Sequence, residues 1–81
     1  MKDTDVLVYP NPASNQLFIQ TGLNLANSVF NIYNLAGEIV LQQQINSKTD
    51  VINISCLISG VYIYKIEQNN KIIDTGKFVK Q

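Results

Sequence analysis

The sequence has no histidine, no arginine and no tryptophan, and it has one cysteine, Cys56, in 81 residues. Without histidine the commonest general base and metal ligand is missing. A single cysteine excludes an internal disulfide and any cysteine-rich zinc site. We therefore expect no enzyme, no catalytic residues, no metal and no cofactor.

Charge is also scarce, with six lysines, six acidic residues and a net charge of zero. Nucleic-acid binding needs a clustered basic surface and usually arginine for bidentate contacts, so we predict no nucleic-acid partner. No apolar run approaches the roughly 18 residues of a membrane-spanning helix, and nothing resembles a signal peptide. We therefore expect no membrane span.

The few candidate reactive groups favour structural interpretations. Asp3 and Asp5 could bind calcium weakly, but calcium takes six to eight oxygen ligands, so a solvated pair is favoured. The apolar setting of Cys56, "VINISCLISG", predicts a buried, unreactive thiol. The glycosylation sequon at 53–55 falls within a predicted strand and receives little weight.

The chain is long enough for one domain, and 46% of its residues are hydrophobic, which allows a packed core. Short segments rich in Val, Ile, Tyr and Phe, most with partial period-two alternation, predict an all-β fold, and no window shows a helical stripe. The seven predicted strands are Asp5–Tyr9, Gln16–Thr21, Ser28–Asn34, Glu38–Ile45, Asp50–Ser55, Gly60–Gln68 and Lys71–Lys80.

Turn residues separate these segments. Pro10 and Pro12 have a fixed φ and no N–H, so the first strand should end at Tyr9, and residues 13–15 should turn the chain into the second. In "NLAGE", Gly37 suits the left-handed position of a bulged hairpin, and Asn69-Asn70 suits a two-residue hairpin. Gly76, inside the last segment, predicts a bulge or a break in pairing.

The stretch "CLISGVYIYKI" at residues 56–66 has the form of a tyrosine corner, with Tyr62 as the corner residue and Leu57 packed beneath it. Seven short strands and this corner predict an immunoglobulin-like β-sandwich of antiparallel strands. The core is expected to contain Phe18, Phe30, Ile32, Val40, Ile52, Ile54, Tyr62, Tyr64 and Phe78.

Three stretches in this order, "VYPNPASNQLFIQ", "FNIYNLAGEIV" and "INISCLISGVYIYKIEQNNKIIDTGKFVKQ", resemble the C-terminal sorting domain of the type IX (Por) secretion system of Bacteroidota. The resemblance covers residues 5–81, which leaves residues 1–4 as a linker or an expression start. It implies a non-catalytic sorting signal that directs an N-terminal cargo protein across the outer membrane. The implied partners are the outer-membrane export machinery with its shuttle protein and a sortase-like peptidase that removes the domain.

The resemblance also implies a route and a set of site residues. The protein would pass through the periplasm and reach the cell surface or the extracellular space, and the cut would lie near or upstream of Asp5. The implied residues are the turn Pro10, Asn11, Pro12 and Ala13, the structural Gly37, Gly60 and Tyr62, and the final stretch Lys77, Phe78, Val79, Lys80 and Gln81. Gly76 and Ile39 depart from the family pattern.

The final strand is the stretch where we favour recognition, because a terminal strand can pair with a partner through its free edge. Its lysines would then protect that edge from aggregation until a receptor covers it. The alternative function is an adhesive or carbohydrate-binding module. Such modules usually present a flat row of exposed aromatic rings, and this chain has four tyrosines and no tryptophan.

Overall fold

The computed structural model describes residues 6–45 and 49–81, and in this part of the chain every regular element is a β-strand. No helix of the described residues is long and apolar enough to cross a membrane. The strands are β1 (Val6–Tyr9), β2 (Gln16–Thr21), β3 (Ser28–Tyr33), β4 (Ile39–Ile45), β5 (Thr49–Asn53), β6 (Gly60–Gln68) and β7 (Lys71–Lys80).

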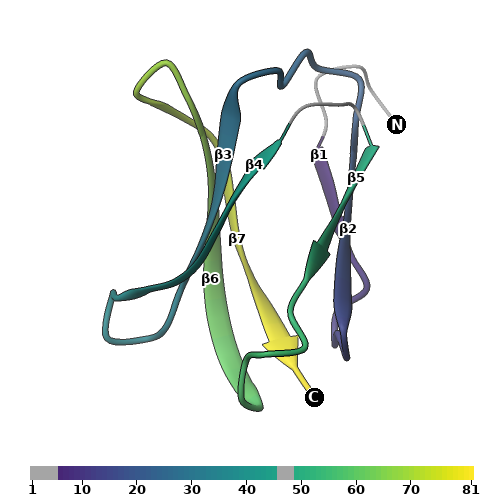
Figure 1. Cartoon of the computed structure of the whole chain (residues 1–81), viewed down its shortest axis with the longest axis vertical. Helices are drawn as coiled ribbons and strands as arrows, with labels where there is room; N and C mark the ends of the chain where they lie inside the picture. The colour runs from purple at the N-terminus through teal and green to yellow at the C-terminus, as the bar shows by residue number, and fades with distance from the viewer. Residues whose placement is uncertain (1–5, 46–48) are drawn as a thin grey trace.

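The strands form two packed sheets, one of three strands in the order β1-β2-β5 and one of four strands in the order β4-β3-β6-β7 (Figure 1). Every pair within the sheets is antiparallel. The predicted immunoglobulin-like sandwich is confirmed. The fifth strand ends at Asn53 instead of Ser55, because Ile54 begins a turn in which its carbonyl accepts a hydrogen bond from the Leu57 N–H at 3.0 Å.

The core lies between the sheets and is aliphatic and aromatic, as period-two alternation requires of strands with one buried face. Its buried residues are Ala13, Leu17, Ile19, Leu25, Phe30, Ile32, Ile45, Ile52, Ile54, Leu57, Tyr62, Ile66 and Phe78. Six of the nine expected core residues are among them. Phe18 instead lies half-buried on the outer face of the three-stranded sheet, where it stacks on Tyr9. Val40 is exposed, and Tyr64 packs half-buried against the core.

Local turn chemistry follows the sequence closely. Gly37 has a φ of 87°, and the register between β3 and β4 shifts at Tyr33, which confirms a bulged hairpin. Asn69 and Asn70 have φ values of 53° and 64° and form the two-residue β6–β7 hairpin. The Tyr62 hydroxyl donates a hydrogen bond of 2.6 Å to the carbonyl of residue 58, so the tyrosine corner is also confirmed.

The prediction for Gly76 is wrong, because β7 runs without interruption and Gly76 pairs directly with Tyr64 on β6. A Cβ at this position would lie 2.7–2.8 Å from atoms of the Tyr64 ring and hydroxyl. Glycine is therefore required for the close approach of a ring and not for a change of backbone direction. The register shift between β6 and β7 lies instead at Ile66 and Glu67.

Cys56 is exposed, which corrects the expectation of a buried thiol. The two apolar residues that follow it divide between two environments, since Leu57 joins the core and Ile58 is 81% exposed. In a turn, neighbouring residues do not alternate between two faces as they do in a strand. An apolar sequence setting therefore did not predict burial here.

The contacts of Tyr64 with the core and with Asp74 can be tested by their pH dependence. Burial, followed by the charge of Asp74 and a hydrogen bond to its carboxylate at 3.2 Å, raises the pKa of Tyr64 to about 12. The unfolded chain has a tyrosine pKa of about 10, so the stabilisation from neutral Tyr64 is complete below pH 10 and is lost as pH rises through 12. We expect the melting temperature to fall over this window and one phenol to ionise later than usual in ultraviolet absorbance.

The control for this titration is Tyr64→Phe, which should lack the late phase. A late phase that persists in Tyr64→Phe, or that is absent from the folded wild-type protein, would contradict the assignment.

Candidate recognition site on the C-terminal strand

The proline-containing turn between β1 and β2 forms hydrogen bonds with β7 of the other sheet. β1 pairs with β2 up to Tyr9 and then leaves the three-stranded sheet, and the turn reaches β7 at the edge of the other sheet. There Ala13 forms a parallel bridge with Lys80. The Ala13 N–H donates to the carbonyl of Val79 and the Ala13 carbonyl accepts from the N–H of Gln81, both at 2.8 Å.

The side chain of Asn11 extends this pairing toward the middle of β7. Its Oδ1 accepts a hydrogen bond from the Val79 N–H at 2.9 Å, and its Nδ2 donates a longer one of 3.4 Å to the carbonyl of Lys77. An amide side chain carries one donor group and one acceptor, so it occupies the edge as a strand's own peptide group would. The flanking Pro10 and Pro12 have no N–H to contribute, and the peptide bonds preceding them are both cis.

The terminal strand therefore does not have the free edge that the sequence suggested. Between Lys77 and Gln81, backbone groups that face away from β6 are already bonded to Asn11 and Ala13. An unpaired edge would be a template for aggregation. The turn protects this edge by main-chain and amide pairing, in addition to any effect of the lysine charges.

Side chains of the last strand alternate between two environments. Phe78 points into the core, where its ring stacks on Tyr62 with 5.6 Å between centroids. Lys80 is only 8% exposed, and its Nζ donates a hydrogen bond of 2.9 Å to the carbonyl oxygen of Gln81. Lys77 and Val79 are exposed. A binding partner would therefore meet Lys77 and Val79 directly, whereas Phe78 holds the strand in place.

The structure brings together the two stretches that the resemblance singled out, Pro10–Ala13 and Lys77–Gln81. Gly60 also lies at this end of the sandwich, since it pairs with Lys80. Gly37, in the hairpin between β3 and β4, lies at the same end of the sandwich but on strands away from β7. Val61, which pairs with Val79 and is 41% exposed, was not predicted from the sequence. No local signal distinguishes Val61, because its position depends on the register between β6 and β7.

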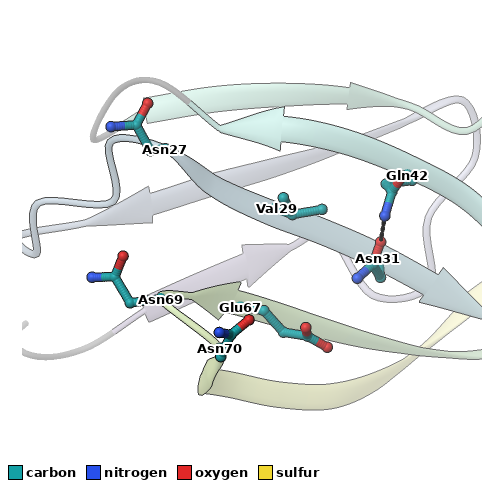
Figure 2. Close-up of a pocket in the computed structure, with 7 residues that line it drawn as sticks. All are labelled: Asn27, Val29, Asn31, Gln42, Glu67, Asn69 and Asn70. Carbon is teal, nitrogen blue, oxygen red and sulfur yellow. Dashed lines mark hydrogen bonds between the residues drawn. The ribbon is translucent and has the colours of Figure 1, made fainter.

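A second surface feature lies toward the opposite end of the four-stranded sheet, where amide side chains line a shallow hollow of about 220 Å³ (Figure 2). Its floor includes Asn31, whose Oδ1 accepts a hydrogen bond of 2.8 Å from Gln42 (Figure 2). The residues around the hollow are Asn27, Val29, Asn31, Gln42, Glu67, Asn69 and Asn70. It lacks an aromatic ring on which a sugar could stack.

The aromatic rings do not form one platform. Tyr9 lies on the outer face of the three-stranded sheet, where it stacks on Phe18 at 5.6 Å. Tyr33 belongs to β3 in the other sheet, and the ammonium of Lys65 lies 4.9 Å from its ring centroid. This arrangement differs from the row of exposed rings that a carbohydrate-binding module usually presents.

Fold and site together define a small immunoglobulin-like sandwich whose last strand is held at its edge by its own opening turn. Comparison with known proteins identifies the family of this domain. The family model described as "Secretion system C-terminal sorting domain" matches residues 7–81, and the chain belongs to this family. The family is one of non-catalytic type IX sorting signals, and membership implies secretion to the cell surface or the extracellular space.

One similar solved structure is that of PorZ, described as an essential bacterial surface component of the type IX secretion system of Porphyromonas gingivalis. The match has a TM-score of 0.68 and 24% sequence identity, and it covers 94% of this chain. It covers 11% of the PorZ chain, so the chain corresponds to a small part of that protein, and the likeness supports the fold. A search of curated proteins found no match.

Proposed function

We propose that this domain carries an N-terminal cargo protein across the outer membrane by the type IX route and performs no catalysis itself. Support comes from the family match over residues 7–81. The observation that carries the proposal is the joining of the Pro10–Ala13 turn to Lys77–Gln81, because it assembles the two family motifs into one folded surface. The export machinery and its shuttle protein would recognise that surface as a unit.

The proposal includes transit through the periplasm followed by removal of the domain by a sortase-like peptidase. The bond to be cut would lie near or upstream of Asp5, which is outside the described residues, as are Asp3 and the proposed linker at 1–4. A sorting domain that is folded before export suits this order of transit followed by removal. Hydrogen bonds from Asn11 and Ala13 keep the last strand in the sheet until a receptor binds.

The test is a fusion of residues 5–81 to the C-terminus of a periplasmic reporter in a host with a type IX system. We expect the reporter to become sensitive to protease added to intact cells. The control is the same fusion in a host that lacks the export channel, where the reporter should stay protected. If the folded fusion stays in the periplasm of the competent host, the proposed function is wrong.

A further inference from the structure

The outer face of the four-stranded sheet changes character along its strands. Toward the β6–β7 hairpin it is polar and carries the amide-lined hollow (Figure 2). Toward the end that holds the C-terminus it becomes apolar. The strand registers bring together Ile39, Tyr33, Ile63, Val61 and Val79, one or two from each of the four strands, and we call this set the apolar patch.

Registers place the patch residues side by side. Tyr33 lies opposite Ile39 on one neighbouring strand and opposite Ile63 on the other. Val61 lies opposite Val79 in the adjoining row. Directly opposed side chains on one face of a sheet have Cβ atoms about 4.5–5.5 Å apart, so these rows make a continuous surface.

Much of this patch is accessible although it is made of large apolar groups. Ile39 is 53% exposed, Val61 41% and Val79 40%. Isolated exposed aliphatic residues are normal on a protein surface, but a contiguous set that spans four strands is typical of an interaction site. Val79 also belongs to the Lys77–Gln81 stretch of the candidate recognition site.

A separate hollow of about 320 Å³ lies at the tyrosine corner. Its lining includes Val40 and Tyr62, and Tyr62 faces the core side of the sheet, because successive strand residues point to opposite faces. Ile58, which also lines it, is 81% exposed. The hollow contains no patch residue and is not part of the outer-face surface.

Charge indicates the kind of partner. Lys77 lies directly opposite Ile63, and Lys65 extends over the ring of Tyr33, so both ammonium groups border the patch. The carboxylate of Glu38, next to Ile39 in the chain, is engaged by the Asn34 amide at 3.0 Å. Partners complement such a surface with an apolar centre and acidic groups around it, which favours correct orientation and rapid association.

We propose that the apolar patch is the surface on which a protein of the export machinery docks, through an apolar face with carboxylates opposite Lys65 and Lys77. This inference rests on the proposed function and assigns Ile39, Val61 and Ile63 to recognition in addition to the final strand. A flat sheet face with half-exposed side chains fits a protein surface better than a lipid bilayer, because insertion into lipid requires apolar groups that protrude.

The chain offers a closely matched pair of variants for the test, Val61→Asp in the patch and Val51→Asp on β5 in the other sheet. Both are strand valines, 41% and 40% exposed respectively. In the reporter fusion, Val61→Asp should lower the rate of export at least about tenfold relative to Val51→Asp, since loss of one buried apolar contact corresponds to that factor. Melting temperatures of the two purified variants should fall by similar amounts.

Lysine reversals supply a second matched pair. Lys77→Glu should slow export, whereas Lys71→Glu, also exposed but at the other end of β7, should not. Equal export of Val61→Asp and Val51→Asp would reject the proposal that the apolar patch is the docking surface. If the wild-type fusion is exported in that experiment, the proposed function still stands. Binding of the wild-type chain, but not Val61→Asp, to vesicles of phosphatidylglycerol and phosphatidylethanolamine would overturn it in favour of a lipid surface. Failure of the wild-type fusion would reject both proposals.

Discussion

Replacing Phe78 with alanine is expected to remove a large share of the domain's free energy of unfolding and to lower its melting temperature strongly. Phe78 is 1% exposed and stacks on Tyr62 between the two sheets. Removal of a buried phenylalanine side chain costs about 3–5 kcal/mol of the free energy of unfolding. A chain of 81 residues has a total of only roughly 4–12 kcal/mol at the usual value per residue. Thermal denaturation followed by circular dichroism measures the loss.

The matched control is Val79→Ala, one residue further along the same strand. Val79 is 40% exposed on the outer face, so its truncation should change the free energy of unfolding by no more than about 1 kcal/mol. Equal destabilisation by both substitutions would contradict the inward position of Phe78.

The burial of Phe78 also bears on export experiments. Deletion of Lys77–Gln81 removes a core residue, so it would abolish export even if no receptor bound the strand. Point variants on the outer face separate recognition from folding.

Replacing Gly76 with alanine should destabilise the domain by about 1–3 kcal/mol, the usual cost of inserting a group into a packed site. The new Cβ would lie 2.7 Å from the Tyr64 hydroxyl oxygen. That ring has little freedom to move away, because it stacks on Phe30 at 5.4 Å between centroids and bonds to Asp74. In an open strand the same change would be stabilising by about 0.5–1 kcal/mol, since glycine loses more backbone entropy on folding.

A double-mutant cycle with Tyr64→Ala separates the two effects. With the ring removed, Gly76→Ala should cost nothing or slightly stabilise the domain, so the coupling free energy measures the contact. Urea denaturation of the four proteins provides the values. If Gly76→Ala is equally destabilising with and without the Tyr64 ring, the contact is not the reason for glycine.

Local features of the fold were accessible from the sequence because they depend on neighbouring residues. Strands β2, β6 and β7 were predicted with the bounds that the structure shows, since β-branched and aromatic runs there are bounded by turn residues. Gly37 and Asn69-Asn70 adopt positive φ as their residue types favour. The tyrosine corner was predictable because its hydrogen bond spans four residues.

Burial was predicted less well, because it depends on which face a residue meets. Phe18 was predicted to lie in the core from its residue type. It alternates with the buried Leu17 and Ile19, however, and so lies on the outer face of its sheet. Cys56 is apolar in its setting but lies in a turn. Gly76 was interpreted through its backbone, whereas the structure explains it through the ring of Tyr64.

The sequence by itself determined the class of this protein: an all-β chain without histidine, with the ordered motifs of a sorting domain. Only the tertiary structure decided that Asn11 and Val79, 68 residues apart, are bonded to each other. It also decided that Val61 and Val79 share a face. The physical reason is that turns and strands follow from local backbone preferences, whereas pairing partners follow from sheet order and register, which the whole chain settles together.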